Sequence, residues 1–214
     1  MVKRNAVNAL GIVVILGSAW GLSECALGAG LHACASKMSG SIMTGVALFF
    51  VAAAWAATEK AWSIALLVAI ASLFKMFDAL LLSLPLRDGA IANPIFAFVL
   101  EGAAFVVVAA IVAGKLGKRT AGRAVWGGSA ALLAAGAFPL VKSVTGIAAC
   151  LAPGTSIPLT WYYAPLAVGL SLITAPLGIW AGERAAGIRL RIKFFEPSLA
   201  VALSLALMVL ARHF

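Results

Sequence analysis

Long apolar stretches alternate along this chain with short polar or basic segments. Each stretch has the length of a membrane-spanning helix, because the hydrocarbon core of a bilayer needs about 20 apolar residues. We expect about seven spans, at residues 8–34, 40–58, 61–84, 91–114, 124–150, 161–182 and 196–213. The last one begins at Glu196-Pro197 and is the weakest, so six is the alternative count. Because the loops are short, sequential helices are expected to pack as antiparallel neighbours in one bundle.

The composition indicates a polytopic α-helical membrane protein. Of the 214 residues, 64% are hydrophobic and only 11% are charged, which is not typical of a soluble domain. Transmembrane β-strands would alternate apolar and polar residues over short segments, whereas the apolar runs here are continuous. We therefore predict an all-α fold, a transmembrane helical bundle that forms one domain over residues 1–214.

The net charge of +9 is informative about topology. With the N-terminus inside, eleven lysine and arginine residues face the cytoplasm and three face out. This asymmetry predicts a cytoplasmic N-terminus in a multi-pass protein of the cell (inner) membrane. The basic residues lie in short loops between apolar spans, so the charge indicates a lipid bilayer as partner and no nucleic acid.

Ionisable residues interrupt the first span. Trp20, Glu24, Gly28 and His32 recur every four residues, so they lie along one face of a helix. An ionisable residue inside a bilayer is costly and therefore indicates a functional site. We expect this helix to form one wall of a buried polar site.

Other spans contribute further polar residues in their outer halves. Lys75 and Asp78 lie three residues apart in the third span, Glu101 lies about two turns beyond Asn93 in the fourth, and Lys142 follows the kink expected at Pro139 in the fifth. Aromatic residues begin the sixth span and would lie at the mouth of the site. The predicted ligand-binding residues are Trp20, Glu24, His32, Lys75, Asp78, Asn93, Glu101, Lys142, Trp161 and Tyr162.

Each of these residues also has a purely structural explanation. Lys75 and Asp78 could be an intrahelical pair that snorkels to the surface. Glu24 and Glu101 could be polar contacts between helices, and His32 could lie among the headgroups. The aromatic residues that begin the sixth span could form an interfacial belt.

Metal and catalytic chemistry receive less support. A soft-metal site would draw on Cys25, His32, Cys34, Met38 and Met43. These residues have no recognised ligand spacing, so we predict no metal site and assign no cofactor. A disulfide between Cys34 and Cys150 stays an alternative in an oxidising compartment. Common hydrolase and nucleotide-binding motifs are absent from the sequence, so no catalytic residue is predicted.

Three motifs together carry a family resemblance. They are Trp20-Gly21-x-x-Glu24-x-x-Leu27-Gly28-x-x-x-His32, Lys75-x-x-Asp78, and Asn93-Pro94 followed by Glu101. Over residues 9–114 the chain resembles the substrate-binding (S) components of energy-coupling-factor transporters for vitamins and metals. The resemblance implies a compact bundle that captures a scarce small molecule from outside and works with a transmembrane coupling subunit and two cytoplasmic ATPases.

The chain departs from that family in two ways. Typical S components have six helices, whereas about seven are expected here. The metal-specific members carry an N-terminal histidine motif, whereas this chain begins Met1-Val2-Lys3-Arg4. We expect a transport or solute-binding protein that takes a small polar or zwitterionic molecule into an outward-facing pocket. The alternatives are an intramembrane enzyme acting on a lipid-like substrate and an anchor subunit of a larger membrane complex.

Overall fold

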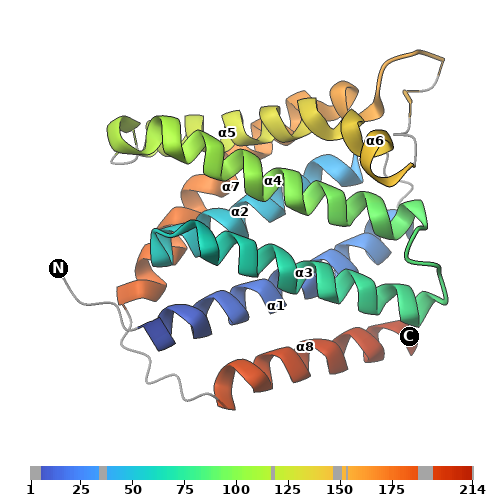
Figure 1. Cartoon of the computed structure of the whole chain (residues 1–214), viewed down its shortest axis with the longest axis horizontal. Helices are drawn as coiled ribbons and strands as arrows, with labels where there is room; N and C mark the ends of the chain where they lie inside the picture. Colours follow the sequence, from blue (N-terminus) through green and yellow to red (C-terminus); the bar gives the residue numbers. More distant parts are fainter. Residues whose placement is uncertain are drawn as a thin grey trace.

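The computed structural model is an all-α bundle whose long helices run roughly parallel or antiparallel to one another (Figure 1). It describes the backbone of residues 6–33, 38–116, 119–146, 151–152, 154–187 and 195–213, and the side chains of residues 8–27, 38–111, 119–146, 151–152, 154–187, 198–207 and 209. In chain order the elements are α1 (Ala6–Ala33), α2 (Ser39–Thr58), α3 (Ala61–Leu82), α4 (Gly89–Leu116), α5 (Thr120–Ala137), η1 (Phe138–Leu140), α6 (Val141–Thr145), α7 (Leu159–Gly187) and α8 (Phe195–His213). The predicted helical bundle is confirmed.

Among the described residues, six helical segments are long and apolar enough to cross a membrane. They match the first six predicted spans, and the fifth continues from α5 through η1 and α6. The seventh predicted span corresponds to α8, which packs against α1. The described apolar segment of α8, Ser198–Leu207, is shorter than a span needs. The protein is therefore a multi-pass membrane protein, and its described residues include six long apolar helices.

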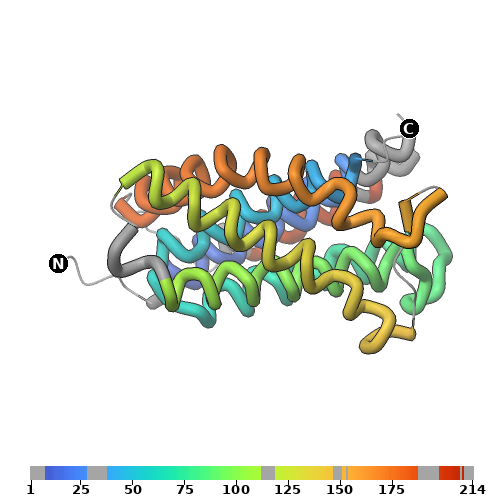
Figure 2. Tube along the Cα trace, turned by 90° about the horizontal axis from the view of Figure 1, so that it is seen from above, coloured from blue at the N-terminus to red at the C-terminus, as the bar shows by residue number. Residues whose placement is uncertain are grey.

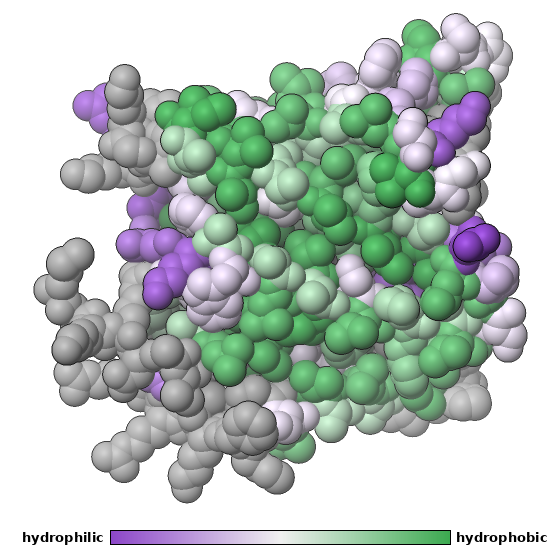
Figure 3. All heavy atoms as spheres, viewed as in Figure 1, coloured by the Kyte–Doolittle hydropathy of each residue, from purple (hydrophilic) through white to green (hydrophobic). Residues whose placement is uncertain are grey.

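The surface agrees with this assignment. A broad apolar band covers the middle of the molecule, and hydrophilic residues gather toward its two ends (Figure 3). Large apolar side chains in this surface are strongly exposed, including Leu80 at 73% and Ile111 at 76%. Exposed apolar surface on this scale is unfavourable in water and is expected where a protein contacts lipid.

The helix neighbours differ in part from the prediction. Sequential long helices from α1 to α5 do pack against one another, but the most extensive packing of α1 is with α3, and that of α2 is with α7. Gly178 and Gly182 of α7 lie directly against the carbonyl oxygens of Phe49 and Ala53 of α2. A side chain at either glycine would overlap those oxygens, so the two glycines permit this close approach.

The half of the bundle around the ends of α2 and α4 and the start of α5 is filled by aromatic side chains. Phe105 and Trp126 stack with ring centroids 4.7 Å apart, and Trp55 meets Trp126 edge-on at 6.1 Å. The Trp126 Nε1–H donates a hydrogen bond of 3.2 Å to the carbonyl oxygen of Phe105. This packing leaves the opposite half of the bundle as the place for a cavity.

The predicted kink at Pro139 is confirmed. The helix α5 ends at Ala137, a 3₁₀ turn contains the proline, and α6 ends at Thr145, followed by Gly146, whose φ of 77° suits a residue without a Cβ. Figure 2 shows α5 running obliquely between α7 and α4, with α6 at its far end. The break places the residues after Pro139 off the line of α5.

Candidate functional site

A cavity of about 1130 Å³ opens between the helices at one end of the bundle. Its wall is formed by the second half of α1, the start of α2, the end of α3, the start of α4, the end of α5 and the start of α7. Most of the lining side chains are apolar, with a small number of polar and charged groups among them. This composition is typical of a small-molecule site.

The cavity lies at the end opposite the more basic end of the bundle. Lys60, Arg119, Arg123 and Arg184 lie at the connections or helix ends away from it. At that basic end Arg123 of α5 pairs with Glu183 of α7 at 2.5 Å. Because basic residues concentrate on the cytoplasmic side, the positive-inside rule predicts that the cavity faces outward.

Glu24 of α1 is a deeply buried carboxyl group of the cavity wall, with 2% of its surface exposed. Its Oε1 accepts a hydrogen bond of 3.1 Å from the indole N–H of Trp20, one turn earlier on the same helix. Trp20 is itself completely buried, and its ring centroid lies 4.9 Å from that of Phe98 of α4. Trp20 thus holds one oxygen of the carboxylate in a defined place.

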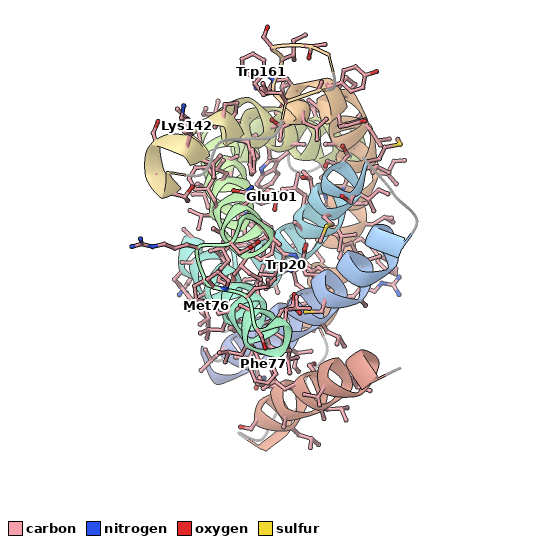
Figure 4. All side chains as sticks on the ribbon, turned by 90° about the vertical axis from the view of Figure 1, so that its right-hand side faces the viewer. Trp20, Met76, Phe77, Glu101, Lys142 and Trp161 are labelled. Carbon is pink, nitrogen blue, oxygen red and sulfur yellow. The ribbon has the colours of Figure 1, made fainter. Side chains whose placement is uncertain are left out.

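Glu101 of α4 is the second buried carboxyl group of the wall, with 4% of its surface exposed. Its side-chain hydrogen-bond partner is Thr44 of α2, and it lies close enough to Glu24 for the two charges to interact. Figure 4 shows Glu101 and Trp20 in the middle of the ring of helices. Carboxyl groups from α1 and α4 therefore approach the same cavity.

Lys75 and Asp78 of α3 form the ion pair expected from their spacing. The Lys75 Nζ lies 2.9 Å from Asp78 Oδ2, and the two side chains are 10% and 16% exposed. Both residues line the cavity, and the Lys75 charge also attracts the carboxylate of Glu24. In contrast, the neighbouring Met76 and Phe77 lie toward the outer side of α3 (Figure 4). The pair is thus at the cavity wall rather than on the lipid-facing side of its helix.

Several buried polar atoms of the cavity residues have no hydrogen-bond partner. Among the described residues these atoms include Glu24 Oε2, Asn93 Oδ1 and Thr160 Oγ1, and all three residues line the cavity. An unsatisfied buried polar atom costs about 1–3 kcal/mol, so it is normally paired in the functional state. Three such atoms from α1, α4 and α7 indicate a place where a bound molecule or water completes the hydrogen bonding.

The structure brings together half of the predicted site residues and places others elsewhere. Five of them line the cavity: Glu24, Lys75, Asp78, Asn93 and Glu101. Trp20 is not among the lining residues, but it donates a hydrogen bond to Glu24. Three other predicted residues have described side chains that do not line the cavity: Lys142, Trp161 and Tyr162.

The reasons for these differences are local. Lys142 is exposed on α6, beyond the break at Pro139, and Figure 4 shows it at the periphery. Trp161 is 50% exposed and donates a hydrogen bond of 3.4 Å to the carbonyl oxygen of Gly136, and Tyr162 is 61% exposed. Both positions suit an interfacial belt at the mouth. The His32 side chain, like the cysteines 34 and 150 of the alternative disulfide, lies outside the described residues.

Sequence reasoning missed the hydroxyl groups of Thr44, Thr160 and Tyr163, whose residues line the cavity. A hydroxyl group in an apolar span is a weak signal, because it is often satisfied by its own helix. Ser171, for example, donates to the carbonyl oxygen of Ala167 one turn earlier at 2.7 Å. Only the packing of α2 and α7 against the other helices shows which hydroxyl groups line the cavity and which are satisfied by their own helix.

Among the described residues no group of three His, Cys, Asp or Glu side chains could hold a metal ion. Of the soft-metal candidates, Cys25 and Met43 line the cavity and Met38 is exposed.

No family model, curated protein or solved structure matches this chain.

Proposed function

We propose that this protein is a solute-binding membrane protein that captures a small polar or zwitterionic molecule in an outward-facing cavity within the membrane. The observation that carries the proposal is the convergence on one 1130 Å³ cavity of charged groups of both signs and of three unsatisfied buried polar atoms. Apolar walls supply most of the contact area for a ligand, and a few fixed polar groups supply its orientation.

The proposed role extends to transport. S components of energy-coupling-factor transporters are the class that the motifs of α1, α3 and α4 resemble, and the six long apolar helices agree with the helix number typical of that class. In this role the chain captures its solute from outside the cell membrane, and a transmembrane coupling subunit with two cytoplasmic ATPases drives transport. Purification from native membranes is expected to recover these partners in a stoichiometric complex.

Ligand-dependent thermal stabilisation tests solute binding directly. The purified protein is heated in detergent with each member of a panel of vitamins, vitamin precursors and other polar solutes. A ligand at 100 times its dissociation constant adds about 2.7 kcal/mol of stability, which raises the melting temperature of a chain of this size by about 5–10 °C. We expect at least one solute to stabilise the wild type by this amount.

Two variants and one control relate that shift to the cavity. Glu24→Gln and Glu101→Gln keep the side-chain shape and remove the charge, and each is expected to reduce the shift strongly. Glu59→Gln removes a carboxylate from the exposed connection between α2 and α3, at the opposite end of the molecule, and is expected to keep the full shift. No stabilisation by any solute, or equal shifts in all variants, would contradict solute binding in this cavity.

The same preparation distinguishes an intramembrane enzyme. Incubation with lipid-like substrates is expected to leave them unchanged. Product formation that is abolished in Glu24→Gln would overturn the binding proposal in favour of catalysis, because buried carboxyl groups are competent acids and bases.

A further inference from the structure

The charges of the cavity wall do not balance. Among the described residues that line it, Glu24, Asp78 and Glu101 carry carboxyl groups, whereas Lys75 carries the single basic side chain. That ammonium group is already bound to Asp78 at 2.9 Å. In the described wall, Glu24 therefore shares the charge of Lys75 with Asp78, and Glu101 has no basic residue of its own.

These two carboxyl groups lie where an unpaired charge is expensive. Glu24 is 2% exposed and Glu101 is 4% exposed, inside helices that cross a bilayer. One oxygen of Glu24 is hydrogen-bonded to Trp20, but the other has no partner. Buried charges are normally paired or fully hydrogen-bonded, so the ionised form of these carboxyl groups would be stabilised by a positive group beside them.

The surroundings of the two carboxyl groups indicate what kind of cation fits. Phe98 lines the cavity beside Trp20, and Phe138 and Tyr163 line it farther along. Aromatic faces attract organic ammonium groups, and the apolar remainder of the wall suits an apolar body. The volume of about 1130 Å³ is much greater than a bare ion needs.

Resting on the proposed solute-binding function, we propose that the ligand is an organic cation, with an ammonium or similar positive group between Glu24 and Glu101 and an apolar body in the rest of the cavity. Asn93 and Thr160, each with an unpartnered polar atom, supply hydrogen bonds to polar substituents of that body. The expected ligand is thus narrowed from any small polar or zwitterionic molecule to one that carries a positive charge.

A matched set of indole compounds tests the charge preference. Tryptamine is a cation, tryptophan a zwitterion, tryptophol neutral and indole-3-propionate an anion, whereas the ring system is constant. A second set with a phenyl ring, from phenethylamine to phenylacetate, repeats the comparison with a smaller body. Within each set, the cation is expected to raise the melting temperature most and the anion least. Equal or larger shifts with the neutral or anionic members would overturn the inference.

Charge variants sharpen the test because they move affinity in opposite directions. Glu24→Gln and Glu101→Gln are each expected to weaken tryptamine binding at least about tenfold. Lys75→Gln removes the one positive charge of the described wall and is expected to bind tryptamine more tightly than the wild type. Glu59→Gln controls for the loss of a carboxylate elsewhere. If all three cavity variants weaken tryptamine binding equally, these residues act through packing and the inference fails.

The two proposals can fail separately. If no amine stabilises the protein but a neutral or anionic solute of the wider panel does, the charge inference is wrong and solute binding stands. If nothing in either panel stabilises the protein, both are wrong. Each variant is first checked for an unligated melting transition, so that loss of folding is not counted as loss of binding.

Discussion

Two glycines of α7 allow the cavity walls formed by α2 and α7 to come together, and their replacement gives a quantitative prediction. An alanine Cβ at Gly178 would overlap the carbonyl oxygen of Phe49, and one at Gly182 would overlap that of Ala53. A backbone oxygen cannot rotate away, so α2 and α7 must separate. Gly169, on the same helix, has no neighbouring atom within 4 Å of such a Cβ and is the matched control.

The magnitude follows from two opposing effects. Overpacking a well-packed contact costs about 1–3 kcal/mol. Replacing glycine by alanine inside a helix gains about 0.5–1 kcal/mol of conformational free energy. Gly169→Ala is expected to show only the stabilisation from helix propensity. Gly178→Ala is expected to show that stabilisation together with the cost of overpacking. The difference between the two variants cancels the helix-propensity effect and is expected to be about 1–3 kcal/mol, with Gly178→Ala the less stable.

Reversible unfolding in detergent micelles with increasing mole fraction of sodium dodecyl sulfate, followed by circular dichroism, measures this difference. A value of 1.4 kcal/mol changes the unfolding equilibrium tenfold, which such curves resolve. Gly178→Ala with the same stability as Gly169→Ala, or greater, would refute the close helix contact.

Further predictions concern the buried carboxylate and the orientation. Trp20→Phe removes the hydrogen bond to Glu24. It is expected to lower the free energy of unfolding of the wild type by about 1.5–3 kcal/mol more than it lowers that of a Glu24→Met variant. Additive effects of the two substitutions in this double-mutant cycle would exclude a significant interaction. In a background without the native cysteines, a cysteine introduced by Arg87→Cys is expected to react with a membrane-impermeant maleimide on intact cells. One introduced by Arg119→Cys is expected to react only after lysis; the reverse pattern would place the cavity on the cytoplasmic side.

The buried ionisable groups illustrate how far sequence patterns reach. The pairs Trp20–Glu24 and Lys75–Asp78 were predictable because each lies within one helix, where a spacing of four or three residues fixes neighbours. The approach of Glu101 to Glu24 was expected only as convergence of several spans and depends on how α1 and α4 pack. Lys142 shares the polarity of the other site residues, but the turn at Pro139 places it outside the cavity.

By itself the sequence determined the class of protein, the approximate positions of the first six of its seven expected spans, and the residues that supply the buried charges of α1, α3 and α4. These are local properties, because the thickness of a bilayer and the pitch of a helix act on neighbouring residues. Only the tertiary structure decided that α2 packs against α7, that Tyr163 rather than Tyr162 lines the cavity, and that Thr44 reaches Glu101. Those outcomes depend on the fit between whole helix surfaces, including glycines whose role is visible only once the opposing carbonyl oxygen is known.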